Sequence, residues 1–326
     1  MIDKILAYYL YAFTHLHRDK KNGGAPHKPV LLLSILYEYE AGRITNNQIS
    51  ITPELTYTFS SYWNQLVSTN HSKGFALPFY HLKSEKGNWW QLIPNLGCEL
   101  WIENAGSMRS FGNLSAAIAY AQIDKNLADL LKNDQSRNLL HRAILDTYFP
   151  GKSLILSNQA GNYLFEVKRE MLEESPAEYH TILKKLQTKL DPETYQIEIY
   201  TRDTIFRREI VRSYNDTCCI TGIRVVAPFS FSMVDACHIV PFHKTFNNHP
   251  NNGIALCPNL HRAFDKGAIS INDDYKVIVS SMFVENKEAL YSFTRLSGIQ
   301  IFLPRENNYY PSQESLAWHR KHLFKR

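Results

Sequence analysis

Two histidine-bearing stretches in the last third of the chain constrain its fold more than any other feature. The first, DACHIVPF, spans residues 235–242 and places His238 inside an apolar run. The second, NNGIALCPNLHRAFD, spans residues 251–265 and carries His261 shortly after Pro258. Short apolar runs are typical of buried strands, and a proline is well tolerated in the first turn of a helix. The pattern predicts strand, loop, strand and helix, an arrangement that can direct both histidines at one point.

Such a pair of imidazoles suits hydrolytic chemistry. One ring can take a proton from water while the other binds a metal ion. Each residue also has a simpler interpretation, because a single histidine in an apolar strand is usually a hydrogen-bonded core residue. Asn251 and Asn252 before Gly253 are by themselves typical of a turn.

With Asn252 between them, His238 and His261 resemble the His-Asn-His (HNH) endonuclease motif of the ββα-metal nuclease fold. The flanking texts TCCITG and HRAFDKGAISI resemble the entry and exit of the same family. The resemblance implies that His238 is the general base and that His261 holds a divalent metal, Mg²⁺ or Mn²⁺. It also implies that Asn252 pins the loop by hydrogen bonds and that the substrate is double-stranded DNA.

One position departs from the family pattern. Many members carry an acidic residue or a histidine directly before the general base, as a metal ligand, and here that position is Cys237. Asp235 lies two residues earlier, and alternation along a strand puts it on the same face as Cys237. Asp235 is therefore a candidate metal ligand, directly or through water. If neither residue binds, His261 alone is a poor metal site and the activity is in doubt.

The bulk composition is that of a globular protein of two domains. The chain has 326 residues, of which 44% are hydrophobic and 21% charged, and its net charge of +5 permits a nucleic-acid partner without requiring one. No apolar run approaches the length of a membrane span, and the N-terminus does not resemble a signal peptide. Five cysteines without a CxxC pair favour small buried residues over a zinc site and indicate a cytoplasmic protein.

The fold class expected from these patterns is α+β, with a mixed α/β DNA-reading domain over residues 1–150, a polar linker over 151–190 and an HNH domain over 191–326. Helical spacing predicts helices over 2–17, from His27 to Gly42, over 53–67 and over 201–215, and two more within 114–147. Residues 76–93 are predicted as strand, turn and strand.

The first 150 residues are expected to supply recognition. The text GAPHKPVLLLSIL places His27 and Lys28 just before a helix start, which favours anions. Together with ALPFYHLKSEKGNWWQL and RAILDTYFP, it resembles the sulfur-recognising domain of phosphorothioate-dependent type IV restriction endonucleases, in which this domain precedes an HNH domain. The resemblance implies a shallow apolar sulfur pocket with basic groups around it, to which the candidate contributors are His27, Lys28, Pro78, Phe79, Tyr80, His81 and Arg109.

The function expected from the sequence is therefore a modification-dependent DNA endonuclease that acts in defence against phosphorothioated DNA. Cutting both strands requires two active sites, so we expect a homodimer at least on DNA. Three alternatives remain open at this point. They are an HNH nuclease that reads ordinary sequence or another modification, a DNA-binding protein that cleaves weakly or not at all, and a general nuclease acting on RNA or as a toxin.

Overall fold

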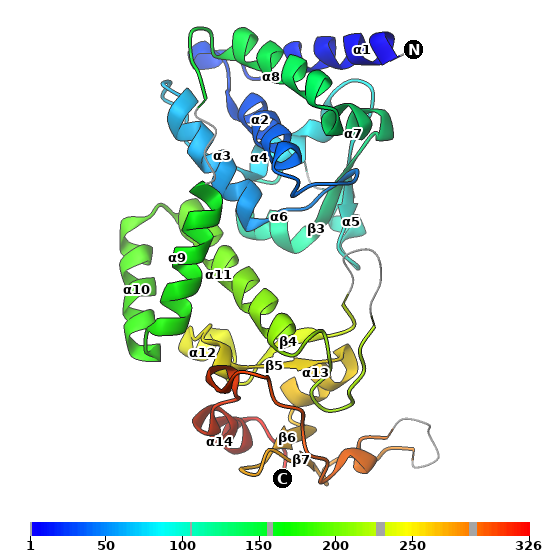
Figure 1. Ribbon diagram of the computed structural model, residues 1–326, viewed down its shortest axis with the longest axis vertical. Helices are drawn as coiled ribbons and strands as arrows, with labels where there is room; N and C mark the ends of the chain where they lie inside the picture. Colours follow the sequence, from blue (N-terminus) through cyan, green and yellow to red (C-terminus); the bar gives the residue numbers. More distant parts are fainter. Residues whose placement is uncertain (1, 105, 155–158, 226–231, 287–291) are drawn as a thin grey trace. The chain divides into compact units, whose positions relative to one another are not determined.

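The structure, a computed structural model, describes residues 2–104, 106–154, 159–225, 232–286 and 292–326 (Figure 1). The chain divides into two compact units, one formed by Met1–Leu164 with Leu190–Glu198 and the other by Phe165–Lys189 with Ile199–Arg326. Both contain helices and small antiparallel sheets, so the α+β class predicted from the sequence is confirmed. Among the described residues, no helix combines the length and apolar character needed to cross a membrane.

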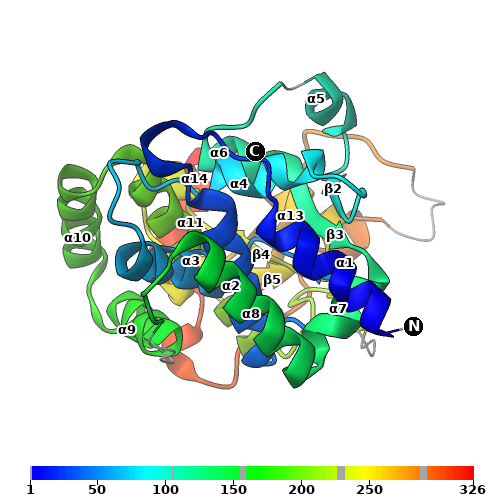
Figure 2. The same ribbon diagram turned by 90° about the horizontal axis from the view of Figure 1, so that it is seen from above.

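The first unit is organised around one helix, α2 (His27–Glu40). Eleven of its fourteen residues are buried, including the run from Lys28 to Leu36. A helix that is buried nearly all round must be covered by neighbours, and α2 packs against several. These are α3 (Pro53–Leu66), α4 (Ala76–His81), α7 (Lys125–Lys132) and α8 (Asp134–Tyr148). In both views α1 (Ile2–Thr14) runs alongside α8 (Figures 1 and 2).

A three-stranded antiparallel sheet of order β1-β3-β2 completes this unit. Its strands are β1 (Gln48–Ile49), β2 (Trp90–Pro94) and β3 (Ile118–Ile123), with Trp90 opposite Ile123 and Ile49 opposite Ala121. Two short helices, α5 (Glu99–Asn104) and α6 (Phe111–Ala117), lie between β2 and β3 in the sequence. Short 3₁₀ turns occupy η1 (Lys21–Gly23) and η2 (Leu82–Ser84).

Three expectations for this half of the chain require correction. Residues 76–81 form a helix and not a strand, because Ala76, Phe79 and Tyr80 are fully buried at helical spacing. Residues 118–123, expected in a helix, form the central strand of the sheet. The segment 151–190, expected as a polar linker, contains α9 (Gln159–Glu173) and α10 (Pro176–Lys189), and Phe165–Lys189 belongs to the second unit.

The second unit carries the strand, loop, strand and helix predicted around the histidines. Strand β4 (Asp235–His238) pairs antiparallel with β5 (Gly253–Leu256), and α13 (Pro258–Asp265) follows. Between the strands lie α12 (Phe242–Thr245) and η3 (Pro250–Asn252). A second hairpin, two 3₁₀ turns and a terminal helix complete the chain as β6 (Ile269–Ile271), β7 (Val277–Val279), η4 (Thr294–Leu296), η5 (Asn307–Tyr309) and α14 (Gln313–His322).

The long helix α11 (Pro192–Ser213) approaches the β4–β5 hairpin closely. A Cβ atom at Gly253 would lie 2.5 Å from Ile210 and 2.7 Å from Phe206, both on α11. Glycine is therefore required here by space and not by backbone conformation. Because Gly253 is paired with His238, the same close approach brings α11 to the end of β4.

Candidate active site

His238 is the last residue of β4, and its ring is held from two directions. The ring stacks on Phe206 at 3.9 Å between centroids and 10° between planes. Its Nε2 donates a hydrogen bond to Oδ1 of Asn248 over 2.8 Å. Burial lowers the pKa of His238 below its ordinary value, against a smaller opposing contribution from the hydrogen bond to Asn248. The ring is therefore neutral near pH 7 and able to accept a proton.

Asn252 is fully buried and uses its side-chain amide to close the loop between the strands. Its Oδ1 accepts from Val240 N over 2.9 Å, and its Nδ2 donates to Val240 O over 3.0 Å. The same Nδ2 lies 3.1 Å from the carbonyl oxygen of Asn247. A single side chain thus fixes the backbone on both sides of the loop, two residues beyond His238.

His261 lies in the first turn of α13 and faces two carboxylates. Its Nδ1 is 3.3 Å from Oδ2 of Asp235, and its Nε2 is 3.5 Å from Oδ2 of Asp265. A neutral imidazole carries a hydrogen on one nitrogen only, so the other nitrogen presents a lone pair to a carboxylate. Two carboxylates around one imidazole therefore form a donor set that suits a cation.

The donor set fits a divalent metal of the hard type. Carboxylate oxygens suit Mg²⁺ and Mn²⁺, and imidazole joins them readily in a mixed site. In the described residues one group of three or more side chains could hold a metal, formed by Cys237, His261 and Asp265 within 4.8 Å of one another. Burial raises the pKa of the Cys237 thiol well above its usual value, and thiolate is the form that binds metal. Asp235, His261 and Asp265 are thus better suited to a hard metal than Cys237.

The structure brings together all four residues that the sequence suggested for this centre, namely Asp235, His238, Asn252 and His261. It adds three that sequence reasoning missed. Asp265 is one helical turn after His261, a spacing that could have identified it. Phe206 and Asn248 reach His238 through tertiary packing and gave no signal in the sequence.

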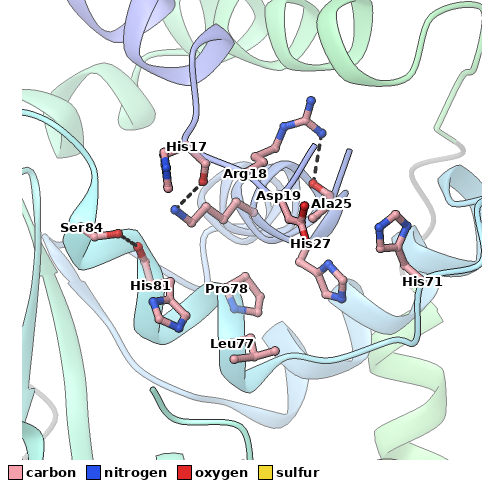
Figure 3. Close-up of a pocket in the computed structure, with 11 residues that line it drawn as sticks. His17, Arg18, Asp19, Ala25, His27, His71, Leu77, Pro78, His81 and Ser84 are labelled. Atoms are coloured by element: carbon pink, nitrogen blue, oxygen red, sulfur yellow. Dashed lines mark hydrogen bonds between the residues drawn. The ribbon is translucent and has the colours of Figure 1, made fainter. Parts of the chain in front are cut away.

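In the first unit, a cavity of about 430 Å³ gathers four of the candidates for modified-DNA recognition, His27, Lys28, Pro78 and His81 (Figure 3). The Pro78 ring has the imidazoles of His27 and His81 on either side of it, with Leu77 beneath (Figure 3). Burial lowers the pKa of both His27 and His81, so both rings are neutral near pH 7. The wall is thus partly apolar and partly formed by neutral hydrogen-bonding groups.

The remaining lining residues add charge and further imidazoles. Arg18 donates to the carbonyl oxygen of Ala25 over 3.0 Å and lies over the ring of Tyr148 at 4.2 Å. It forms the border of the cavity together with His17, Asp19, Ala25, His71 and Ser84. Arg18 and Lys28 are the cations of this lining.

Four of the expected recognition residues differ from expectation in position or availability. Phe79 and Tyr80 are fully buried in the core and do not line the cavity. Arg109 is exposed and lies outside the lining. Lys28 lines the cavity, but its ammonium group is already paired with Glu85 and donates to the carbonyl oxygen of His17.

The cysteines of the second unit are small buried residues, as the absence of a CxxC pair favoured. Cys218, Cys219 and Cys237 have no exposed surface, and Cys257 is 8% exposed. All are free thiols. Within the described ranges, only Cys237 belongs to a group that could hold a metal.

Comparison with known proteins identifies the domain around these residues. Residues 218–272 match the family model described as HNH endonuclease (HNH_2). This match covers His238, Asn252 and His261 and indicates that the C-terminal part of the chain is a DNA nuclease domain. No curated protein matches the chain.

Among solved structures, the chain is similar to one described as "Modification dependent TagI restriction endonuclease". The sequence identity is 20% and the TM-score 0.30. The match covers 38% of this chain and 39% of that chain, so it spans well under half of either protein.

Proposed function

We propose that this protein is a metal-dependent DNA endonuclease in which His238 is the general base. The observation that carries the proposal is the convergence of His238, Asn252 and His261 on one β4–β5–α13 unit inside the HNH match. His238 takes a proton from water, whose oxygen attacks phosphorus while the bond from phosphorus to the leaving oxygen breaks. Asn252 keeps the loop beyond His238 in place and so preserves the position of the base.

Asp235 and His261 would hold Mg²⁺ or Mn²⁺, with Asp265 on the far nitrogen of the imidazole. When bound, the metal supplies positive charge that stabilises the negative charge developing on the phosphate. Asp265, whose Oδ2 lies 3.5 Å from Nε2, would act on the ring itself, because a carboxylate beside the second nitrogen orients a ligating histidine. The two carboxylates thus have separate tasks around one ring.

The proposed role of His238 is tested by measuring cleavage of a labelled duplex under single-turnover conditions in Mn²⁺. His238→Ala should lower the cleavage rate by about 100-fold or more, the contribution expected of a general base. His243→Ala, which changes an exposed histidine five residues away, should leave the rate within about threefold. Equal rates for the wild type and His238→Ala would exclude His238 as the base.

We further propose that the cavity in the first unit reads a phosphorothioate linkage in double-stranded DNA. The support is its mixed lining, in which Leu77 and Pro78 offer apolar contact beside neutral imidazoles and the cation of Arg18. Sulfur is larger and less strongly hydrated than oxygen, so an apolar wall favours it, while hydrogen-bond donors and a cation hold the remaining charge. Two copies of the chain would act on one duplex, because each centre cuts one strand.

Binding to matched duplexes, with and without one phosphorothioate, tests the cavity. The wild type should prefer the modified duplex, and Leu77→Asn should reduce that preference by placing a polar group in the apolar wall. His81→Ala should weaken binding to the modified duplex, whereas His15→Ala, outside the lining, should not. Equal affinity of the wild type for both duplexes would remove the sulfur assignment and leave the nuclease assignment intact.

A further inference from the structure

Asn248 is a buried residue whose side chain forms a hydrogen bond with His238, the proposed base. Its exposed fraction is 0%, and its Oδ1 lies 2.8 Å from Nε2 of His238. Its Nδ2 is sealed from solvent without a hydrogen-bond partner among the described residues. Burying an amide with one unsatisfied donor is unfavourable, so a merely structural residue at this position is not favoured.

The contact determines which nitrogen of His238 carries the hydrogen. An amide oxygen accepts hydrogen bonds and cannot donate them, so Nε2 of His238 bears the hydrogen and Nδ1 bears the lone pair. Nδ1 has no hydrogen-bond partner among the described residues, and it is not one of the unpartnered polar atoms that are sealed from solvent. The nitrogen that can accept a proton is therefore the one left free.

Stacking alone does not make this choice. Phe206 lies flat against the ring of His238 and fixes its plane, but a flat contact is the same for both tautomers. Phe242, at 5.9 Å between ring centroids, is also apolar. Asn248 is the polar partner that distinguishes the two nitrogens.

The position of Asn248 depends in turn on Asn252. The amide of Asn252 donates to the carbonyl oxygen of Asn247, the residue just before Asn248, and bonds both backbone groups of Val240, two residues after His238. Asn252 thus holds the loop on which Asn248 is carried. The two asparagines form one chain of contacts that ends at the ring of His238.

We propose that Asn248 is a positioning residue that holds His238 in the Nε2–H tautomer, so that Nδ1 is the atom that takes the proton from water. This inference rests on the proposed nuclease function, since it assigns an atom to the base of that reaction. It predicts that the tautomer of His238 depends on the acceptor at position 248.

The direct test is the tautomer itself, measured by ¹⁵N NMR on the full chain labelled at histidine, with His238→Ala to assign the signal. The wild type should show hydrogen on Nε2 and a lone pair on Nδ1. Asn248→Leu should lose this state in favour of mixed tautomers. Asn251→Ala, at a neighbouring amide whose backbone N donates to Nδ1 of His249, should retain it. A wild-type signal with hydrogen on Nδ1, or an unchanged tautomer in Asn248→Leu, would overturn the proposal.

Cleavage rates provide a second test that separates positioning from folding. Asn248→Leu should lower the single-turnover rate in Mn²⁺ several-fold at every pH, in proportion to the lost fraction of the Nε2–H tautomer, with duplex binding unchanged. Asn248→Asp keeps an acceptor and should restore the rate at high pH. Its charge favours the protonated ring, so the acid limb of its rate profile should move to higher pH, by about one unit. Equal loss in both variants at all pH values would indicate a structural role only.

The other charged groups that face His238 remain unchanged in these variants. They are Asp203 and Arg207 on α11, and the imidazole of His261 on α13 is also unchanged. A shift of the acid limb in Asn248→Asp is therefore assigned to position 248. If the wild type cleaves no DNA, the proposed function fails while the NMR measurement still decides the tautomer, so the two failures are distinguishable.

Discussion

Oδ2 of Asp235 lies 3.3 Å from Nδ1 of His261, and this contact joins the first residue of β4 to the first turn of α13 across 26 positions of sequence. It places a carboxylate beside an imidazole at the open end of the hairpin. Asp235 thus stands three positions before His238, and its carboxylate lies beside His261 although Cys237 occupies the position directly before His238.

Asp235→Asn is expected to weaken metal binding. The amide is neutral, so it no longer offers a charged oxygen beside His261, and Mn²⁺ affinity should fall by at least about 10-fold. Titration calorimetry with Mn²⁺ measures this directly. Asp274→Asn, at an exposed carboxylate in the turn between β6 and β7, is the matched control and should bind Mn²⁺ as the wild type does. Unchanged affinity in Asp235→Asn would assign the metal to other residues.

Cys237→Ala should leave metal binding and cleavage within about threefold of the wild type. The thiol is fully buried, its pKa is raised by that burial, and its sulfur lies 3.8 Å from Oδ1 of Asp265 as a weak donor. Loss of a buried side chain should lower the free energy of unfolding by about 1 kcal/mol. A large loss of Mn²⁺ affinity in Cys237→Ala would identify sulfur as a ligand.

The cleavage rate should depend on pH through His238. Burial of the ring places the pKa of His238 in the folded protein below the ordinary histidine value. The ring therefore stays neutral, and able to act as a base, at pH values where an ordinary histidine would already be protonated. The rate should therefore stay high near pH 7 and fall only as the pH drops through the lowered pKa. Single-turnover rates between pH 5 and 8 would show this, and an acid limb above about 6.5 that His238→Ala removes would contradict the assignment.

The free energy of unfolding should decrease in acid because His319 becomes protonated. This ring is fully buried on α14, where Nδ1 meets Ser270 Oγ at 2.8 Å and Nε2 donates to the carbonyl oxygen of Phe264 over 3.0 Å. Burial lowers its pKa to about 4. Because the unfolded chain binds the proton more readily, the stability it contributes is complete above about pH 6.5 and is lost toward pH 4.

The free energy of unfolding contributed by His319 should fall by about 3 kcal/mol at the acid end of this pH range. Denaturant unfolding at several pH values, compared between the wild type and His319→Gln, isolates this contribution from those of other histidines. The free energy of unfolding of His319→Gln should depend less on pH than that of the wild type. His322→Ala, at an exposed histidine of the same helix, should match the wild type. Identical pH dependence in all three proteins would exclude His319 as the source.

The parts that the sequence predicted well are those determined locally. Pro29 near the start and Gly42 just after the end marked α2 correctly. The two short apolar runs and Pro258 gave β4, β5 and α13 in order. The roles of His238, Asn252 and His261 were inferred from the resemblance to the HNH motif and remain predictions, although the structure places all three on the β4–β5–α13 unit.

The parts that the sequence did not predict depend on partners far along the chain. Phe79 and Tyr80 were assigned to a strand because aromatic residues favour strands, but packing against the core made that segment helical. Lys28 is paired with Glu85, 57 positions away, which no local pattern indicates. Asn248 reaches His238 through a loop whose path is fixed by tertiary hydrogen bonds.

Cleavage of one plasmid, prepared with and without phosphorothioate linkages, tests the account most directly. With Mn²⁺, the wild type should cut the modified plasmid and leave the unmodified one intact, and His238→Ala should cut neither. Equal cutting of both plasmids would contradict recognition of sulfur by the cavity at Pro78. Cutting of the modified plasmid by His238→Ala at the wild-type rate would contradict the nuclease centre itself.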